Sequence, residues 1–212
     1  MALLLVWTWV KDKIMPLGAF KAALMGTAGV ATETVVLLHD TDYSGASTAS
    51  ITSGIDSTYG HYIFKFYNIN PSGDGETFKF QVNATDTADY NDVPITSTVW
   101  VAYHTPNDSF AAVTYQGGAD QEQGTAFQAL PDGFSSDADH HGSGTLHLFD
   151  PSSTTYAKHF YSKWQYSASW NESVSTQHIA GYLNTTTAID DIQFKFGSGT
   201  FDGTIKMWGV KD

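Results

Sequence analysis

Four pairs of closely spaced aspartates are the residues of this sequence that could support acid–base chemistry. They are Asp40/Asp42, Asp89/Asp92, Asp137/Asp139 and Asp190/Asp191. Glycosidases use two facing carboxylates in this way, one as the acid and one as the nucleophile or base. Four of these eight aspartates have Ser, Thr or Asn directly beside them, a setting typical of turns, where Asp caps the backbone. We therefore assign no catalytic residue, and a polysaccharide-degrading hydrolase is the third of three hypotheses.

A metal site and a serine nucleophile are the other two chemistries that the sequence could hold. His140 and His141 follow two aspartates, but adjacent side chains in an extended loop rarely bind one ion, and no further ligand has a fixed spacing. Ser143 lies between two glycines in "HGSGT" without the strand-turn-helix frame of a nucleophile elbow. Cys is absent. We expect no metal, no cofactor and no enzymatic activity.

Large aromatic residues are the best candidates for binding. Their flat rings could stack on sugars, or they could form the centre of a protein–protein contact. We predict contact residues, for a protein interface first and for a sugar second, at Trp100, Tyr103, Trp164, Trp170 and Trp208.

Composition excludes several classes of partner. The chain has 212 residues and a net charge of −12, and its ten basic residues are all Lys. Nucleic-acid binding depends on neutralising phosphates, commonly with Arg, so neither a nucleic acid nor an anionic membrane is expected as partner. Hydrophobic residues make up 42% of the chain, enough for a sizeable core.

The pattern along the chain predicts an all-β fold. Short segments with alternating apolar and polar residues are separated by turn-rich loops, as in antiparallel β-sandwiches and jelly rolls. The predicted strands are 34–39, 61–69, 77–82, 97–104, 111–116, 145–150, 155–164, 177–184, 191–197 and 203–210. We expect one jelly-roll-like sandwich domain over 34–212, preceded by a helical or irregular lead-in over 1–33. Within that lead-in, 16–26 could form a short helix, and 1–14 are interpreted as an extension upstream of a start at Met15.

Two local patterns make this prediction specific. The turn signal "NPSGDG" at 70–75 predicts that the strands 61–69 and 77–82 form a hairpin. In the last strand, alternation places Ile205 and Met207 in the core and Lys206 and Trp208 outside, with a turn at Asp202-Gly203 before it.

Several segments resemble a family of structural proteins of marine tailed bacteriophages that infect cyanobacteria and Pelagibacter-like hosts. The resemblance rests on "MPLGAFKAALMGTAG", "SGIDSTYGHYIFKFYNINP", "GTLHLFDPSSTTYAKHFYS", "AGYLNTTTAIDDIQFK" and "GSGTFDGTIKMWGV". It implies an antiparallel β-sandwich that is an external virion component, as capsid decoration or in a tail or fibre. We therefore expect a non-enzymatic homo-oligomer that assembles with itself and with other virion proteins. A carbohydrate-binding module for a host-surface glycan is the alternative.

Overall fold

The computed structural model describes residues 34–85 and 89–211. From Val35 onward the chain forms one compact unit. The predicted lead-in over 1–33, with its helix at 16–26, lies outside the described residues.

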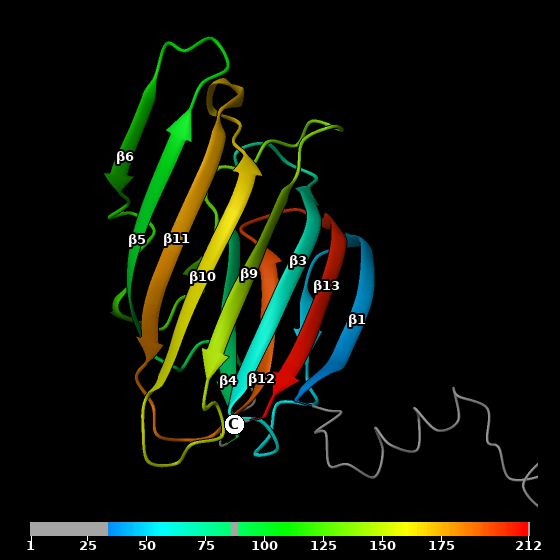
Figure 1. Ribbon diagram of the computed structural model, residues 1–212, viewed down its shortest axis with the longest axis vertical. Coiled ribbons are helices and arrows are strands. Elements are labelled where there is room, and N and C mark those ends of the chain that lie inside the picture. Colours follow the sequence, from blue (N-terminus) through cyan, green and yellow to red (C-terminus); the bar gives the residue numbers. More distant parts are fainter. Residues whose placement is uncertain (1–33, 86–88, 212) are drawn as a thin grey trace, which may run out of the picture. The chain divides into compact units, whose positions relative to one another are not determined.

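Two antiparallel sheets form this unit, as the sequence pattern predicts (Figure 1). The large sheet has nine strands: β1 (Val35–Ala46), β3 (His61–Pro71), β5 (Ile95–His104), β6 (Ala111–Tyr115), β7 (Glu122–Gly124), β9 (Gly142–Phe149), β10 (Lys158–Ser167), β11 (Val174–Leu183) and β13 (Phe201–Val210). The small sheet has four: β2 (Ala49–Ile51), β4 (Phe78–Ala84), β8 (Gln128–Ala129) and β12 (Ile189–Phe196). A single 3-10 turn, η1 (Trp170–Glu172), joins β10 to β11.

The order of the strands is that of a jelly roll with two insertions. The set β1-β13-β3-β9 faces the set β2-β12-β4-β8, which is the arrangement of eight strands in two interleaved Greek keys. The remaining strands enter between β4 and β8 (β5, β6, β7) and between β9 and β12 (β10, β11). They extend the large sheet past β9 in the order β10-β11-β5-β6. The insertions therefore add a wing to the large sheet that the jelly roll itself does not require.

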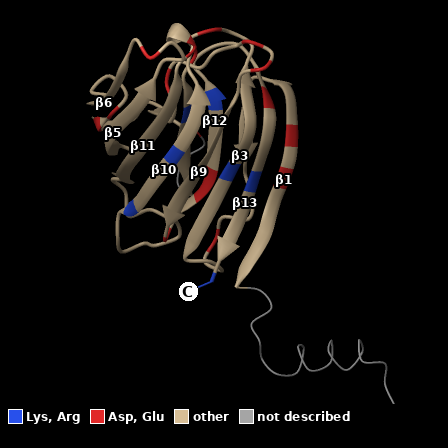
Figure 2. Cartoon of the chain, turned by 45° about the horizontal axis from the view of Figure 1, so that its top comes forward, with Lys and Arg blue, Asp and Glu red and all other residues tan. Residues whose placement is uncertain are grey.

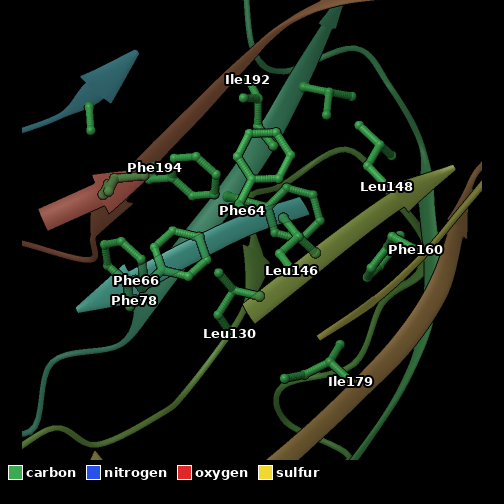
Figure 3. Close-up of a cluster of buried hydrophobic side chains, with 14 of the residues drawn as sticks. Phe64, Phe66, Phe78, Leu130, Leu146, Leu148, Phe160, Ile179, Ile192 and Phe194 are labelled. Carbon is green, nitrogen blue, oxygen red and sulfur yellow. The ribbon is translucent and has the colours of Figure 1, made fainter. Parts of the chain in front are cut away.

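The core lies between the sheets and is rich in phenylalanine (Figure 3). Alternation on β3 directs Phe64 and Phe66 inward, where they meet Phe194 of β12 edge-to-face at 5.6 and 5.0 Å between ring centroids. Full burial of one such side chain contributes about 1.5–3 kcal/mol, so these rings stabilise the packing of the two sheets against each other.

The hairpin predicted for 61–69 and 77–82 is wrong. β3 pairs with β13 and β9 in the large sheet, whereas β4 pairs with β12 and β8 in the small one. Both strands carry Phe on their inward face, so they bury these residues against each other across the sandwich. Phe66 and Phe78 meet edge-to-face at 5.8 Å.

The last strand is confirmed, but it begins earlier than predicted. Ile205 and Met207 are buried, and Trp208 lies on the opposite face of β13 between β1 and β3. Asp202 and Gly203 belong to β13 instead of forming a turn: the pairing with β3 shifts there, as in a β-bulge. Gly203 has φ 141°, and a Cβ at this position would come within 2.6 Å of Ile69 Cδ1, so the bulge requires glycine.

Candidate functional site: the outer face of the large sheet

The face of the large sheet that points away from the small sheet concentrates aromatic, histidine and lysine side chains. We define the outer face as the outward residues of β3, β9, β10, β11 and β5. They are His61, Ile63, Lys65, Tyr67, Ser143, Thr145, His147, Phe149, His159, Tyr161, Lys163, Gln165, Val174, Thr176, His178, Ala180, Tyr182, Thr96, Thr98, Trp100, Ala102 and His104. None of these side chains is a carboxylate, although the chain has 22 acidic residues. Five of the eight histidines of the chain are on this face: His61, His104, His147, His159 and His178.

One row of side chains crosses the face at a single level of the strands. In order of pairing it runs Lys206, Lys65, Thr145, Lys163, His178, Trp100 and Tyr115. Lys206 and Lys65 are directly opposite each other, a placement that destabilises a sheet when the charges are not compensated. Asp40 accepts from Lys206 Nζ at 2.9 Å, and Lys65 Nζ lies 5.2 Å from the ring centroid of Trp208. Within the part of the chain that the structure describes, Lys65 therefore has an aromatic neighbour rather than a carboxylate.

Beside this row, four rings stack across three strands. His61 stacks on Phe149 at 4.5 Å, His147 stacks on Tyr161 at 4.3 Å, and His61 Nε2 and His147 Nδ1 share a hydrogen bond of 2.9 Å. One of these two nitrogens must be unprotonated to accept the hydrogen bond, so both nitrogens cannot carry a proton at the same time. Burial, with smaller effects of His61 and Lys65, lowers the pKa of His147. The four rings form an aromatic surface, and protonation of its histidines would add positive charge to it.

The carboxylates lie around the outer face rather than on it. Figure 2 shows Lys on β3, β10 and β13, and acidic residues on β1 and in the loops. Asp40 and Asp42 are on the edge strand β1, where they bind Lys206 Nζ and Thr204 Oγ1, and Glu122 pairs with Thr96 at the other edge. Asp190 and Asp191 lie in β12 of the small sheet. The first and last aspartate pairs are therefore in strands and not in turns as expected.

Two of the five predicted contact residues lie on this same side of the large sheet. Trp100 is 41% exposed and stacks on His178 at 4.1 Å with an angle of 6° between the rings. Trp208 is half-buried between Leu37 of β1 and Ile63 of β3. Leu37 and Val35 are exposed large apolar residues, so they extend the apolar surface to the edge of the sheet.

Two other predicted residues lie on the opposite side. Tyr103 and Trp170 meet edge-to-face at 5.6 Å at the end of the wing, together with Phe110. Tyr103 follows the inward alternation of β5, and Trp170 lies in η1. These rings form an aromatic cluster that is separate from the outer face.

Trp164 is not a contact residue, which corrects the prediction. It is 1% exposed, stacks on Phe66 at 4.7 Å and donates from Nε1 to Ser162 Oγ at 2.9 Å. Alternation along β10 puts it on the inward face with Phe160 and Tyr166.

The histidines of the outer face, Phe149 and Tyr161 were missed by sequence reasoning. Their outward direction can be read from alternation, since His61 has the same parity as Lys65, and Tyr161 the same as Lys163. Their proximity could not be read, because it depends on β3, β9 and β10 being neighbours.

In the loop that carries His140 and His141, His140 contacts two neighbouring polar side chains. His140 Nδ1 lies 2.8 Å from Ser135 Oγ and 3.6 Å from Asp137 Oδ2. Within residues 34–85 and 89–211, no group of three or more His, Asp or Glu side chains is arranged to hold a metal ion. The same part of the chain has no helix long and apolar enough to cross a membrane.

Comparison with known proteins adds little to this geometry. No family model and no curated protein matches the chain. Among solved structures, a protein of unknown function from Bacteroides ovatus is 9% identical with a TM-score of 0.19, over 68% of this chain and 45% of that one. This chain therefore spans less than half the length of that protein. An aerolysin-like protein of Bombina maxima is 6% identical with a TM-score of 0.14, over 76% of this chain and 92% of that one. At such TM-scores neither likeness bears on the function.

Proposed function

We propose that this protein is a non-enzymatic structural protein of a phage virion that assembles through the outer face of its large sheet. The observation that carries the proposal is the outer face itself, which has aromatic, Lys and His side chains and no carboxylate in a chain of net charge −12. The virion setting is supported by the resemblance of several segments to structural proteins of marine tailed phages.

A second copy of the chain is the partner that the charges favour. Acidic residues lie in loops and on the edge strand β1, so each copy carries a surface complementary to the outer face of another (Figure 2). Aromatic residues are enriched at the centres of protein interfaces and charge complementarity sets their specificity. Trp100 and Tyr161, both more than 40% exposed, would become buried in such a contact.

Sedimentation velocity of the full chain over a concentration series tests this proposal. Association should strengthen at low salt and at about pH 5.5 relative to about pH 7.5, because protonated histidines meet acidic loops. The double variant Lys65→Glu/Lys163→Glu, with two reversed charges in the row, should weaken association by about tenfold or more. Trp208→Ser should weaken it while the monomer stays folded.

The matched control is Lys211→Glu/Lys79→Glu, which makes the same change in net charge away from the outer face. A chain that remains monomeric under all these conditions, or a control that dissociates as much as the test variant, would overturn assembly through this face. The virion setting has its own test, which is detection of the protein in purified phage particles with a specific antibody.

A further inference from the structure

A cavity of about 300 Å³ lies at the far end of the wing, on the side opposite to the outer face. Its walls come from both insertions and from the loop after β8. They are formed by Val101, Tyr103, Gln116, Asp132, Gly133, Tyr166, Ala168, Ser169, Trp170, Ser173 and Ser175. This volume is at the lower end of the range for small-molecule sites, which suits one ring rather than an extended ligand. We call it the Trp170 cavity.

An aromatic wall is held in place on one side of the Trp170 cavity. Tyr103 and Phe110 are stacked at 5.8 Å, and the ring of Trp170 is nearly perpendicular to both, at 84° and 87°. Trp170 is nevertheless 50% exposed, so part of the indole is open to the cavity or to solvent. The two residues that follow it, Asn171 and Glu172, both have φ of 50°. Each such conformation costs of order 1–3 kcal/mol, and strain of this kind gathers at binding and catalytic sites.

The polar side of the cavity has a hydroxyl without a partner. Ser173 is 1% exposed, lines the cavity, and its Oγ makes no hydrogen bond to any residue that the structure describes. A buried polar group left unsatisfied costs about 1–3 kcal/mol. Oγ itself is buried, so a ligand hydroxyl in the cavity would hydrogen-bond to it after the Ser173 side chain rotates about χ1. The Asp132 carboxylate and Gln116 also line the cavity, whereas the Tyr166 hydroxyl already donates to Asp132 O at 2.9 Å.

We propose that the Trp170 cavity binds a single neutral pyranose ring, at the end of a glycan or as a free sugar. The apolar face of such a ring would stack on Trp170, and its hydroxyls would pair with Ser173 Oγ and the Asp132 carboxylate. Among the described residues, the lining contains no Lys or His and its one charged side chain is an acid, so uronic and sialic acids are repelled. This proposal is independent of assembly, because none of its wall residues belongs to the outer face.

Ligand-observed saturation-transfer NMR with the full chain tests the proposal. The probes are the methyl glycosides of glucose, galactose, mannose and N-acetylglucosamine at about 10 mM, above a millimolar Kd. Saturation should reach the ring protons of at least one of them. It should disappear with Trp170→Ala, and Ser173→Ala should weaken binding by about tenfold, the effect of one lost buried hydrogen bond.

Trp100→Ala is the matched control, since it removes an exposed tryptophan from the other side of the same sheet. It should leave the signal unchanged, and a thermal melt of each variant checks that the domain is folded. If no probe receives saturation, the partner of the Ser173 hydroxyl is water and the proposal is overturned. It is also overturned if the signal survives Trp170→Ala, or if methyl glucuronide binds as well as the neutral sugars.

Discussion

Trp164 and Trp100 show how the two faces of one sheet give the same side chain different roles. Trp164 is 1% exposed on β10 and packs over Gly144, where an added Cβ would come within 2.4 Å of the indole. Trp100 is 41% exposed on β5 and contacts a histidine. Removing the Trp164 ring would leave a large cavity, whereas removing the Trp100 ring would not.

Trp164→Ala should therefore lower the free energy of unfolding by about 3–5 kcal/mol, the usual cost of removing a large buried aromatic side chain. Trp100→Ala should change it by less than about 1 kcal/mol, as at most surface positions. Urea denaturation followed by far-UV circular dichroism measures both. Equal costs for the two variants would mean that the inward and outward faces of β5 or β10 have been exchanged.

Side-chain direction could be predicted from the sequence to a large extent. Ile205, Met207 and Trp208 point as their alternation indicates. The burial of Trp164 also had a signal, because Lys163 and Gln165 alternate with Trp164 and Tyr166 and one face of β10 must therefore be the polar one. The sequence contains no such signal for the Ser173 hydroxyl, which lacks a partner among the described residues, because that depends on which segments surround its loop.

Which strands pair with each other could not be predicted from the sequence. Strand positions were mostly predicted within a few residues, and the jelly-roll class follows from their number and spacing. In a jelly roll, however, neighbours in space come from distant parts of the chain, and β1 pairs with β13. A hairpin between 61–69 and 77–82 is the natural interpretation of two adjacent strands joined by a turn, and it fails because the fold sends them to different sheets. The outer face could not be predicted for the same reason.

A buried hydrogen bond ties the wing to the small sheet. Ser97 Oγ of β5 donates to Gln128 Oε1 of β8 at 2.6 Å, and Gln128 Nε2 donates to Ala119 O at 2.9 Å. Both side chains are buried. Gln128 thereby anchors β5 and the loop between β6 and β7 to the jelly roll.

Gln128→Leu should lower the free energy of unfolding by about 2 kcal/mol, because the Ala119 carbonyl and the Ser97 hydroxyl each lose a partner in a place that water does not reach. The double variant Ser97→Ala/Gln128→Leu should cost less than the sum of the single variants, since their shared bond is counted twice. Urea denaturation of the four proteins of this cycle gives the coupling. Strict additivity would contradict a direct bond between β5 and β8.

Across the whole molecule, the histidines oppose the acidic charge only when they are protonated. Burial lowers the pKa of His39, of His147 and of His178, with Lys163 adding to the effect at His178 and Lys65 and His61 adding to it at His147. The unfolded chain titrates these groups near pH 6.5. Below that pH the unfolded state binds more protons than the native state, so stability rises with pH through this window.

Above about pH 6.5 we therefore expect the isolated monomer to keep the full contribution of these histidines to its free energy of unfolding. This contribution should be lost progressively as the pH falls toward the lowered native pKa values. The three-site variant His39→Gln/His147→Gln/His178→Gln should show a smaller loss between about pH 7 and pH 5 than the unmodified chain. The free energy of unfolding, measured in urea at each pH and at a protein concentration too low for association, checks this. Association through the outer face should have the opposite pH dependence and strengthen as the pH falls, because an acidic partner stabilises protonated His147 and His178. A chain that becomes less stable as a dilute monomer but associates more strongly at the same low pH would separate the two effects, whereas a pH-independent stability would contradict the burial of these imidazoles.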